Sequence, residues 1–477
     1  MPRRHIRVIG APEAPLRAAL RALRTELGVP ESFPPEVLAE AERPPRLPSY
    51  DATDIPLFTI DPPTSTDLDQ AMHLARRGRG GYRVRYAIAD VAAFVAPGGA
   101  LDAEAHRRVT TLYFPDGKVP LHPTRLSEGA ASLLPDQTCP AVLWTIDLDA
   151  DGRAESTDVR RALVRSRAKL DYAHVQKQID TGTAEGPLAL LKVIGEKRER
   201  LEVERGGISL NVPEQEIVER DGTYDLVYRA PFPADSWNAQ LSLLTGMAAA
   251  ELMLAHGTGV LRTLPAAPDG AVGRLRRTAD ALRINWPHHV SYARLIRSLD
   301  PHWPHHAAFL QECTTLLRGA GYTVFRDGVL PEVTSHSAVA APYAHCTAPL
   351  RRLVDRYASE ICLAAAAGQS PPDWVRAALD ELPKQMAEGT RRAGTVEREC
   401  LDIVEAALLK DRVGDVFDGC VVDVQEHQPT VGTVQLESPA VFARLAGGTA
   451  ALPLGERLPV RLTQADPGAA KVEFTPA

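Results

Sequence analysis

The stretch IDPPTSTDLDQA, residues 60–71, places Asp61, Asp67 and Asp69 within nine residues of one another. It follows Leu57–Ile60, an apolar run with the length and composition of a short strand. Its two prolines restrict the backbone, and its hydroxyl side chains can hydrogen-bond to nearby peptide groups. Three carboxylates held this close repel one another unless a cation lies between them. The stretch therefore predicts a site for a hard divalent ion, Mg²⁺ or Mn²⁺.

The alternative interpretation of residues 60–71 is a solvated, aspartate-rich turn, and for such a pattern taken alone it is the commoner one. A calcium loop of the EF-hand type is not indicated, because the D-x-[DN]-x-[DN]-G spacing with its closing glutamate is missing. Two divalent ions about 4 Å apart form the usual clamp for in-line cleavage of a phosphodiester. The metal interpretation therefore indicates phosphodiester chemistry.

The 477 residues include 61 acidic and 54 basic side chains, for a formal net charge of −7. This length predicts about two to four domains. Hydrophobic residues make up 44% and charged residues 24%, which is ordinary for globular domains and excludes wholesale disorder, collagen-like chains and disulfide scaffolds. The acidic average, taken alone, disfavours a nucleic-acid-binding protein, because such domains usually carry a basic excess.

The six cysteines include no C-x-x-C pair, so no zinc or redox motif is visible. Their scatter is typical of reduced thiols in a cytosolic protein. The first residues lack the apolar core of a secretory signal. The most apolar run, Leu241–Ala255, is shorter than the roughly 20 residues that span a bilayer and contains Glu251. We expect a soluble, cytoplasmic protein that makes no membrane contact and acts as a monomer.

The pattern of helix-forming and strand-forming residues divides the sequence into three expected segments. Residues 1–50 predict short helices over 12–27 and 35–41 and then a linker, as a docking element or part of a helix-turn-helix-like module. Residues 51–410 have a mixed α/β texture, and residues 411–477 consist of short β-rich runs typical of a small antiparallel barrel. Within the middle segment we expect strands at 57–60, 82–88 and 141–148, and helices at 188–204, 237–256, 306–320, 349–366 and 373–410.

Five motifs, in this order, resemble the signatures of the ribonuclease II/ribonuclease R (RNB) family of 3′→5′ exoribonucleases. They are residues 60–71, YAIADV at 86–91, LDAEA at 101–105 with YFP at 113–115, VPLHP at 119–123 with Leu126-Ser127, and YAHCTAPLRR at 343–352. The resemblance covers about Asp51 to Ala366. It implies an α+β fold, with a mixed-sheet RNB catalytic core surrounded by helices and a C-terminal OB-fold barrel of the ribosomal S-one type.

The resemblance also implies roles for individual residues. It assigns metal binding to Asp61, Asp67 and Asp69, and Asp69 is taken as catalytic. The family has a fourth aspartate where this sequence has Gln70, which can bind a metal through its carbonyl oxygen but brings no negative charge. Arg351 matches the catalytic arginine of the family, whose planar guanidinium suits the charge that develops on the oxygens of a phosphodiester.

Three further residues are expected to contact RNA. Tyr113 matches the aromatic residue that stacks on the 3′-terminal base, a contact that tolerates every base. Arg352 is expected to contact backbone phosphates or internal acids, and the residues alone leave both open. His345 is expected to contact substrate or to be structural.

Two local features of the motifs bear on chemistry. Pro349 at the start of the expected helix 349–366 predicts that Arg351 lies in its first turn. The glutamate pair that the family has near the start of its central helix corresponds to Ala239-Gln240 here. Discrimination of RNA from DNA by the 2′-hydroxyl is therefore expected to use other groups or to be weaker.

The implied function is a Mg²⁺-dependent, hydrolytic 3′→5′ exoribonuclease, with Mn²⁺ as a substitute. It would thread a single-stranded RNA 3′ end and release 5′-nucleoside monophosphates by a two-metal mechanism. Larger family members carry two cold-shock domains that have no counterpart in residues 1–50, so a short form with an altered entrance and tolerance of structured RNA is expected. The alternatives are an RNA-binding protein with an impaired active site, favoured by Gln70, and a phosphodiesterase acting on DNA or oligonucleotides.

The charge distribution refines the expectation of RNA binding. From Asp411 onward there are nine acidic and five basic residues, which is unfavourable for phosphate contact, so whether the barrel binds RNA stays open. Only eight of the 54 basic residues are lysines, and the rest are arginines, which suit bidentate phosphate contacts. We expect a local, arginine-lined channel inside an acidic protein, with salt-sensitive RNA binding.

Overall fold

The computed structural model describes residues 14–209, 214–220, 223–229, 231–267, 270–300, 303–317, 319–425 and 427–477. The start of the expected helix at residues 12–13 lies outside them. The helices are α1 Ala14–Glu26, α2 Pro35–Ala41, α3 Ala100–Arg108, α4 Tyr172–Asp180, α5 Gly186–Glu204, α6 Pro233–His256, α7 Ala271–Ala281, α8 Tyr292–Arg297, α9 Pro304–Cys313, α10 Leu353–Ala366, α11 Asp373–Ala378 and α12 Leu382–Leu409.

The strands fall into two barrels and four small two-stranded sheets within the described residues. They are β1 Leu57–Ile60, β2 Gln70–Arg76, β3 Tyr82–Ala89, β4 Leu112–Phe114, β5 Gly117–Val119, β6 Thr138–Leu148, β7 Ala154–Leu170, β8 Glu214–Arg220, β9 Thr223–Arg229, β10 Gly259–Thr263, β11 Gly321–Phe325, β12 Ser335–His336, β13 Ala341–Pro342, β14 Val416–Gln425, β15 Gln428–Leu436, β16 Val441–Leu445, β17 Arg457–Asp466 and β18 Lys471–Pro476.

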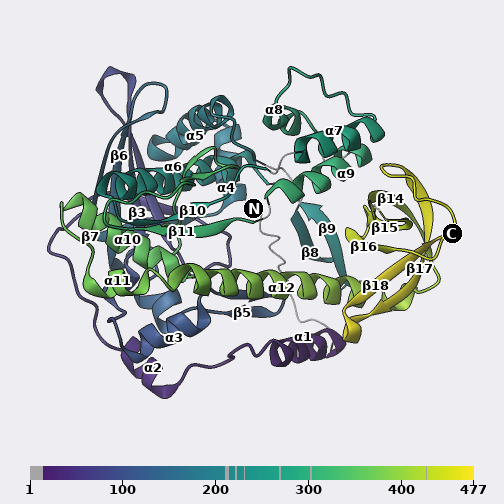
Figure 1. Cartoon of the computed structure of the whole chain (residues 1–477). Coiled ribbons are helices and arrows are strands. Elements are labelled where there is room, and N and C mark those ends of the chain that lie inside the picture. The colour runs from purple at the N-terminus through teal and green to yellow at the C-terminus, as the bar shows by residue number, and fades with distance from the viewer. Residues whose placement is uncertain are drawn as a thin grey trace.

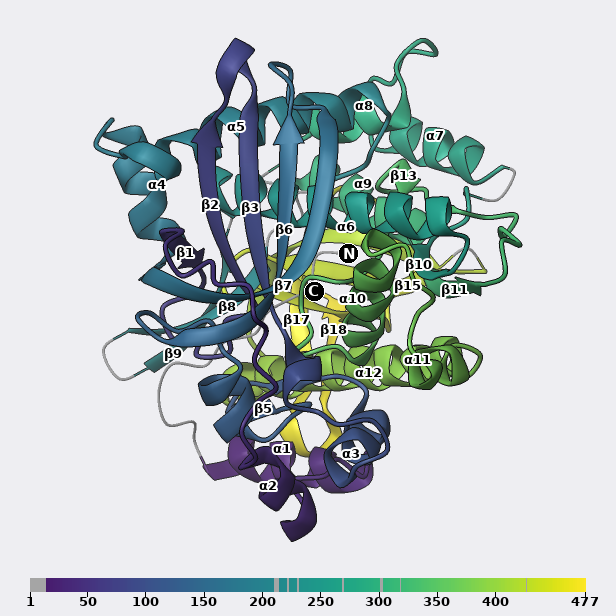
Figure 2. The same cartoon turned by 90° about the vertical axis from the view of Figure 1, so that its left-hand side faces the viewer.

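The first barrel closes in the order β1-β2-β3-β6-β7, and its long strands lie side by side in Figure 2. β1 runs parallel to β7, whereas the other neighbours are antiparallel. The expected α+β core with a mixed sheet is therefore confirmed, and the sheet is closed. Because β1 and β7 are parallel, the segments that follow them, at residues 61 and 171, leave the barrel at the same edge.

Both faces of β3 contribute to the core, which explains why the strand is more buried than its alternating pattern predicts. Tyr82, Val84 and Tyr86 belong to the large cluster that includes apolar side chains of α5, α6 and α10. Ala87 and Ala89 face the other way, into a cluster with side chains from the first 101 residues and from residues 126–143. Alternate side chains of one strand thus pack against two separate layers.

Helix α6 is apolar around most of its circumference because it is enclosed on several sides. It packs against α5, α10 and β10. A Cβ added at Gly246 would come within 2.2 Å of the Tyr343 ring, so the glycine permits the segment after β13 to lie directly on the helix. The carbonyl of Gly246 accepts a hydrogen bond of 3.0 Å from the N–H of Ala344. This contact fixes the start of the YAHCTAPLRR motif on α6.

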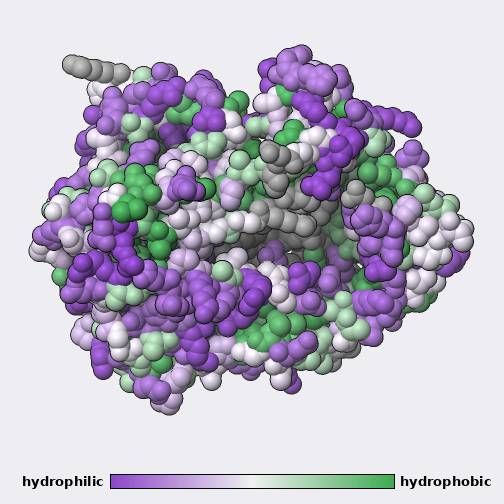
Figure 3. Space-filling model, in the orientation of Figure 1, coloured by the Kyte–Doolittle hydropathy of each residue, from purple (hydrophilic) through white to green (hydrophobic). Residues whose placement is uncertain are grey.

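The C-terminal strands form a second closed barrel in the order β14-β15-β16-β18-β17, as Figure 1 shows in yellow. This confirms the expected barrel, although one pairing, β16 with β18, is parallel. The long helix α12 reaches from β4, β11 and α10 to this barrel, and α1 packs against α12 (Figure 1). The face of the molecule in Figure 3 is mostly hydrophilic and is hollowed near its middle, above α12.

Three helix predictions are wrong in extent. The expected helix 306–320 is α9, which ends at Cys313 and continues as a 3₁₀ turn, Thr314–Leu317, at two β-branched threonines. The expected helix 373–410 is split at residues 379–381 into α11 and α12, and Pro383 lies in the first turn of α12, where its missing N–H leaves no helical hydrogen bond unmade. The third, at 349–366, affects the candidate site and is described below.

Two further expectations concern cysteines and membranes. All six cysteines are free and buried. Among the helices of the described ranges, none has the length and apolar character needed to cross a membrane.

Candidate active site

The aspartate stretch forms the loop between β1 and β2 of the first barrel. Ser132 holds the second half of the loop, since its hydroxyl accepts from the N–H of Leu68 at 2.9 Å and donates to the carbonyl of Thr66 at 2.7 Å. Lys169, at the end of β7, donates from Nζ to the carbonyls of Pro63 and Ser65, both at 2.6 Å. The loop is therefore fixed from two sides by neighbouring parts of the core.

Asp69 connects this loop to the arginine motif, 281 residues further along the chain. One carboxylate oxygen of Asp69 accepts a 2.8 Å hydrogen bond from the N–H of Leu350, and the other lies 3.3 Å from Nε of Arg351. The Asp69 side chain is 6% exposed, whereas that of Arg351 is 31% exposed. A buried carboxylate and a partly exposed arginine side chain thus meet at one point.

The expectation that Arg351 lies in the first turn of a helix is wrong. Helix α10 begins at Leu353, and Arg352 before it has extended backbone angles, φ −138° and ψ 126°. The backbone of this segment bonds to other elements, because the carbonyl of Arg351 accepts from the Thr110 hydroxyl at 2.9 Å and from the N–H of Thr111 at 3.1 Å. Arg351 is therefore held in a turn between two segments.

Removal from water disfavours the charged forms of the Asp61 and Asp69 carboxylates. Desolvation raises the pKa of Asp61 to about 6 and that of Asp69 to about 7, and the negative charge of Asp67 adds to both increases. The positive charge of Arg351 acts in the opposite direction on each. A cation beside these carboxylates would restore their charged forms.

Asp67 has a cationic partner within the chain. Its Oδ1 lies 2.7 Å from Nζ of Lys118, which also lies 3.0 Å from Glu128. In the parts of the chain that the structure describes, no three His, Cys, Asp or Glu side chains form a ready metal site. The carboxylates on this fixed loop, with Asp69 buried and Asp61 half-buried, nevertheless fit a hard divalent cation by donor type. A cation that engaged Asp67 would compete with Lys118.

Gln70 is tied into the protein at both ends of its amide. Its Nε2 donates to the carbonyl of Thr347 at 2.7 Å, and its Oε1 accepts from the hydroxyl of Tyr86. The carbonyl oxygen that a metal would need already has a hydrogen-bond donor. Gln70 thus bridges the aspartate loop and the arginine motif in this structure, and its role as a metal ligand stays a prediction.

Tyr113 reaches the site on the hairpin formed by β4 and β5. It is half-buried, and it lies close enough to Arg351 for the two side chains to interact electrostatically. In the ladder Tyr113 is the direct partner of Lys118. One hairpin therefore presents both the expected stacking residue and the lysine that contacts Asp67.

The two other expected RNA contacts have partners inside the protein. Nε and Nη2 of Arg352 donate to the two carboxylate oxygens of Asp355, at 2.9 and 2.7 Å. The structure thus shows Arg352 paired with an internal acid, and its contact with RNA stays a prediction. His345 lies 2.7 Å through Nδ1 from the hydroxyl of Tyr322, and its ring packs edge-on against those of Tyr322 and Tyr343.

Two residues near the site were not found from the sequence. Lys118 lies between two motifs, and its rarity as a lysine in this chain was the available signal. Tyr172 lies just after β7, as Asp61 lies just after the parallel strand β1. Burial raises the pKa of Tyr172, and the nearby charge of Asp61 raises it further. Its hydroxyl accepts from Asn238 of α6 at 2.9 Å. Tyr172 can be placed near Asp61 only when β1 and β7 are known to pair in parallel, and the sequence does not show this pairing.

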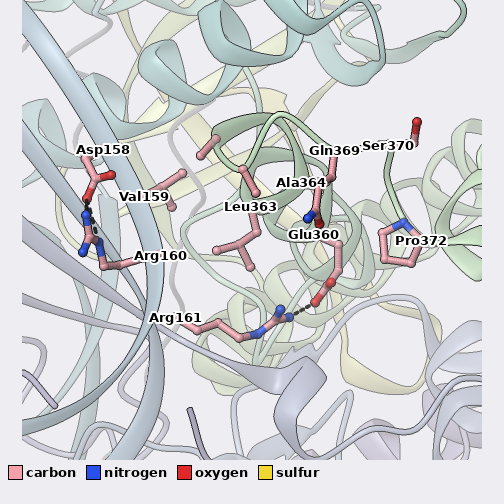
Figure 4. Close-up of a pocket in the computed structure, with 12 residues that line it drawn as sticks. Asp158, Val159, Arg160, Arg161, Glu360, Leu363, Ala364, Gln369, Ser370 and Pro372 are labelled. Atoms are coloured by element: carbon pink, nitrogen blue, oxygen red, sulfur yellow. Dashed lines mark hydrogen bonds and ion pairs between the residues drawn. The ribbon is translucent and has the colours of Figure 1, made fainter. Parts of the chain in front are cut away.

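A separate pocket of about 520 Å³ lies between β7 and the end of α10 (Figure 4). Its charged side chains are paired, Arg160 with Asp158 at 2.9 Å and Arg161 with Glu360. None of the candidate site residues lines it. We assign no chemistry to this pocket.

The chain is similar to several ribonucleases in sequence and in fold. The chain is 26% identical over 441 residues to ribonuclease R of Aquifex aeolicus, which covers 88% of this chain and 62% of that protein. The chain thus spans about three fifths of the length of that relative. Two structures of Mycoplasma genitalium RNase R superpose with TM-scores of 0.85, for a complex with ribose-methylated single-stranded RNA, and 0.83, for a complex with double-stranded RNA. These have 18% and 20% identity and cover 97% of this chain and 78% and 84% of theirs.

The same fold also occurs in a protein described as a pseudonuclease, yeast Ssd1. Its TM-score is 0.68 at 16% identity, covering 92% of this chain and 56% of that one. Likeness of fold at this identity therefore does not establish catalysis. The C-terminal residues 415–477 match the RNase II-type exonuclease C-terminal S1 domain, and residues 49–366 match the RNB domain. Because that match covers two thirds of the chain, the protein belongs to the RNB family.

Proposed function

We propose that the protein is a metal-dependent, hydrolytic 3′→5′ exoribonuclease that releases 5′-nucleoside monophosphates. The observation that carries this proposal is the meeting of Asp69 with Arg351 at 3.3 Å, which joins the first and the last of the five motifs in an RNB-family chain. Buried carboxylates suited to a cation lie there beside a guanidinium suited to a phosphate. We further propose a monomer that works in the cytoplasm, with its domains divided near residues 50 and 410.

The proposed metal ligands are Asp61, Asp67 and Asp69, and the proposed metal is Mg²⁺, with Mn²⁺ as a substitute. When bound, a pair of such ions activates water and holds the scissile phosphate. Arg351 would pair with nonbridging oxygens of that phosphate and stabilise the charge that develops on them. The hydrogen bond from Leu350 holds the Asp69 carboxylate in a fixed orientation, so that little reorganisation is needed on binding.

Tyr113 is proposed to stack on the 3′-terminal base, which is worth about 1–3 kcal/mol for any base. Its nearness to Arg351 places an aromatic surface beside the group proposed to contact the last phosphodiester. This arrangement suits removal of one nucleotide at a time without sequence preference. His345 is proposed to contact the substrate from its place beside Tyr322 and Tyr343.

One observation favours a second candidate, an RNA-binding protein with an impaired active site. Gln70 replaces a carboxylate and is bonded to Tyr86 and Thr347, and a pseudonuclease shares the fold. Three aspartates and Arg351 oppose it, because a site that only bound RNA would not need buried carboxylates next to the phosphate.

Matched RNA and DNA oligonucleotides, end-labelled and incubated with Mg²⁺ or with a chelator, separate these functions. The exoribonuclease proposal expects metal-dependent conversion of RNA to mononucleotides and slower attack on DNA. Binding of RNA without cleavage in either Mg²⁺ or Mn²⁺ would support the impaired site instead. Equal cleavage of both polymers would support a general phosphodiesterase.

The raised pKa values of Asp61 and Asp69 predict that metal binding weakens as the pH falls. A divalent ion binds the charged carboxylates, so protons compete with it below about pH 7 for Asp69 and below about pH 6 for Asp61. We expect the dissociation constant for Mn²⁺, measured by calorimetry with RNA absent, to rise at least about tenfold from pH 8 to pH 6. In the Asp69→Asn variant the dependence should be shallower. An affinity that stays constant over this range would contradict the assignment.

Tolerance of duplex RNA is a further part of the proposal. It is supported by the solved complex of a protein with this fold, M. genitalium RNase R, with double-stranded RNA. We expect a hairpin with a single-stranded 3′ overhang to be degraded into its paired stem, as followed on a sequencing gel with an unpaired RNA of equal length as the control. Trimming of the overhang that stops where pairing begins would contradict this part and leave the exoribonuclease proposal intact.

A further inference from the structure

Helix α1 shares a hydrophobic cluster with the β4–β5 hairpin, which carries Tyr113. Its residues Leu16, Leu20 and Leu23 are buried and belong to the same hydrophobic cluster as Leu112, Phe114 and Val119 of the β4–β5 hairpin. That cluster also contains side chains of α12 and of the C-terminal barrel. The buried face of α1 therefore joins the hairpin to the two elements that follow the catalytic core.

Arg24, in the last turn of α1, holds the turn of the hairpin. Its two terminal nitrogens donate to the two carboxylate oxygens of Asp116, one of them at 3.1 Å. Its guanidinium also lies over the ring of Phe114, 4.2 Å from the centroid. The side chains of Arg24 and Asp116 are only 14% and 23% exposed. The Arg24 guanidinium pairs with both carboxylate oxygens of Asp116, is partly shielded from water and stacks on an aromatic ring. These contacts restrain the orientation of the hairpin turn as well as its distance from α1.

The strand on the other side of that turn is attached to the aspartate loop. Lys118 lies 2.7 Å from Asp67, and the Glu128 carboxylate that Lys118 also contacts accepts a 2.7 Å hydrogen bond from the Thr66 hydroxyl. Tyr113 sits directly opposite Lys118 in the hairpin. The position of Tyr113 relative to the proposed metal ligands is therefore set by two attachments, one of which is Arg24.

We propose that Arg24 is a positioning residue for the reaction, acting through Asp116. By clamping the hairpin turn, it keeps Tyr113 and Lys118 in register with the aspartate loop, so that the last base and the scissile phosphate are placed together. This inference rests on the proposed function. It gives the N-terminal helix a role at the active site that neither a docking element nor a helix-turn-helix-like module would have.

The test compares Arg24→Ala with Arg21→Ala, an exposed arginine one turn earlier on the same helix. Because a small misplacement of a reacting group slows chemistry strongly, we expect Arg24→Ala to lower kcat on single-stranded RNA about tenfold or more. The KM for a long RNA should change less than about twofold, since most of the strand is bound elsewhere. Arg21→Ala should match the unaltered protein in both.

A charge exchange, Arg24→Asp with Asp116→Arg, separates positioning from a merely structural role. It should recover most of the lost kcat, because the ion pair is restored with its direction reversed. Hydrogen exchange of the amides of residues 112–119, measured without RNA, should speed up in Arg24→Ala and not in Arg21→Ala. Unchanged exchange, unchanged kcat or a loss that the exchange of charges does not recover would each overturn the proposal. If the unaltered protein cleaves no RNA, the proposed function fails, and the exchange measurement still decides whether Arg24 holds the hairpin.

Discussion

Asp69→Asn is expected to lower RNA hydrolysis roughly 10³-fold or more while RNA still binds. The substitution keeps the shape of the side chain and an oxygen that can accept from the N–H of Leu350. It removes the charge that a divalent ion needs and that pairs with Arg351 at 3.3 Å. Because burial already disfavours that charge in the metal-free protein, the folded state should tolerate the amide.

The loss should appear in kcat, measured in single-turnover cleavage of end-labelled RNA, and a filter-binding assay should give an RNA affinity within about threefold of the unaltered protein. Asp158→Asn is the matched control, because Asp158 is an exposed aspartate paired with Arg160 and lies outside the candidate site. Full hydrolysis by Asp69→Asn would remove Asp69 from the metal assignment. Loss of both hydrolysis and binding would point to misfolding, which thermal unfolding detects.

Arg351→Lys is expected to lower kcat about 10²- to 10³-fold, although it conserves the positive charge. A lysine offers a point charge in place of the planar fork that pairs with two phosphate oxygens. It also loses the contact of Nε with Asp69. The 31% exposure of the Arg351 side chain leaves it accessible to a substrate, so the effect is on chemistry more than on folding.

The neighbouring Arg352→Lys provides the comparison. The Arg352 side chain is 13% exposed, and its guanidinium pairs with both oxygens of the fully buried Asp355. Arg352→Lys should therefore lower the melting temperature more than Arg351→Lys does. A kcat near normal for Arg351→Lys, or a larger fall in kcat for Arg352→Lys than for Arg351→Lys, would contradict the roles assigned to the two arginines.

Local sequence signals predicted the elements that carry the site. The strand Leu57–Ile60 and helix Pro35–Ala41 have the bounds that apolar spacing and proline position predicted. The order of the motifs identified the family, because each motif restricts backbone and side chains within a few residues. The alternation in β3 was also visible, although only the tertiary structure shows that both of its faces are buried from Tyr86 onward.

What the sequence did not predict depends on contacts between distant segments. Pro349 favours a helix start, but the backbone around Arg351 is taken up by Thr110, Thr111 and Asp69 instead. The bonds of Gln70 and the pairing of Arg352 with Asp355 likewise depend on packing that no local rule contains. Lys118 became relevant only when the hairpin was placed beside the aspartate loop.

The central claim is that this site removes nucleotides from the 3′ end of RNA by metal-dependent hydrolysis. The most direct measurement follows one RNA labelled in parallel at its 5′ end and at its 3′ end, with Mg²⁺ present. We predict that the 3′ label appears in mononucleotide from the first turnovers while the 5′-labelled strand shortens step by step. Early release of the 5′ label, internal fragments, or intact RNA in both Mg²⁺ and Mn²⁺ would contradict it.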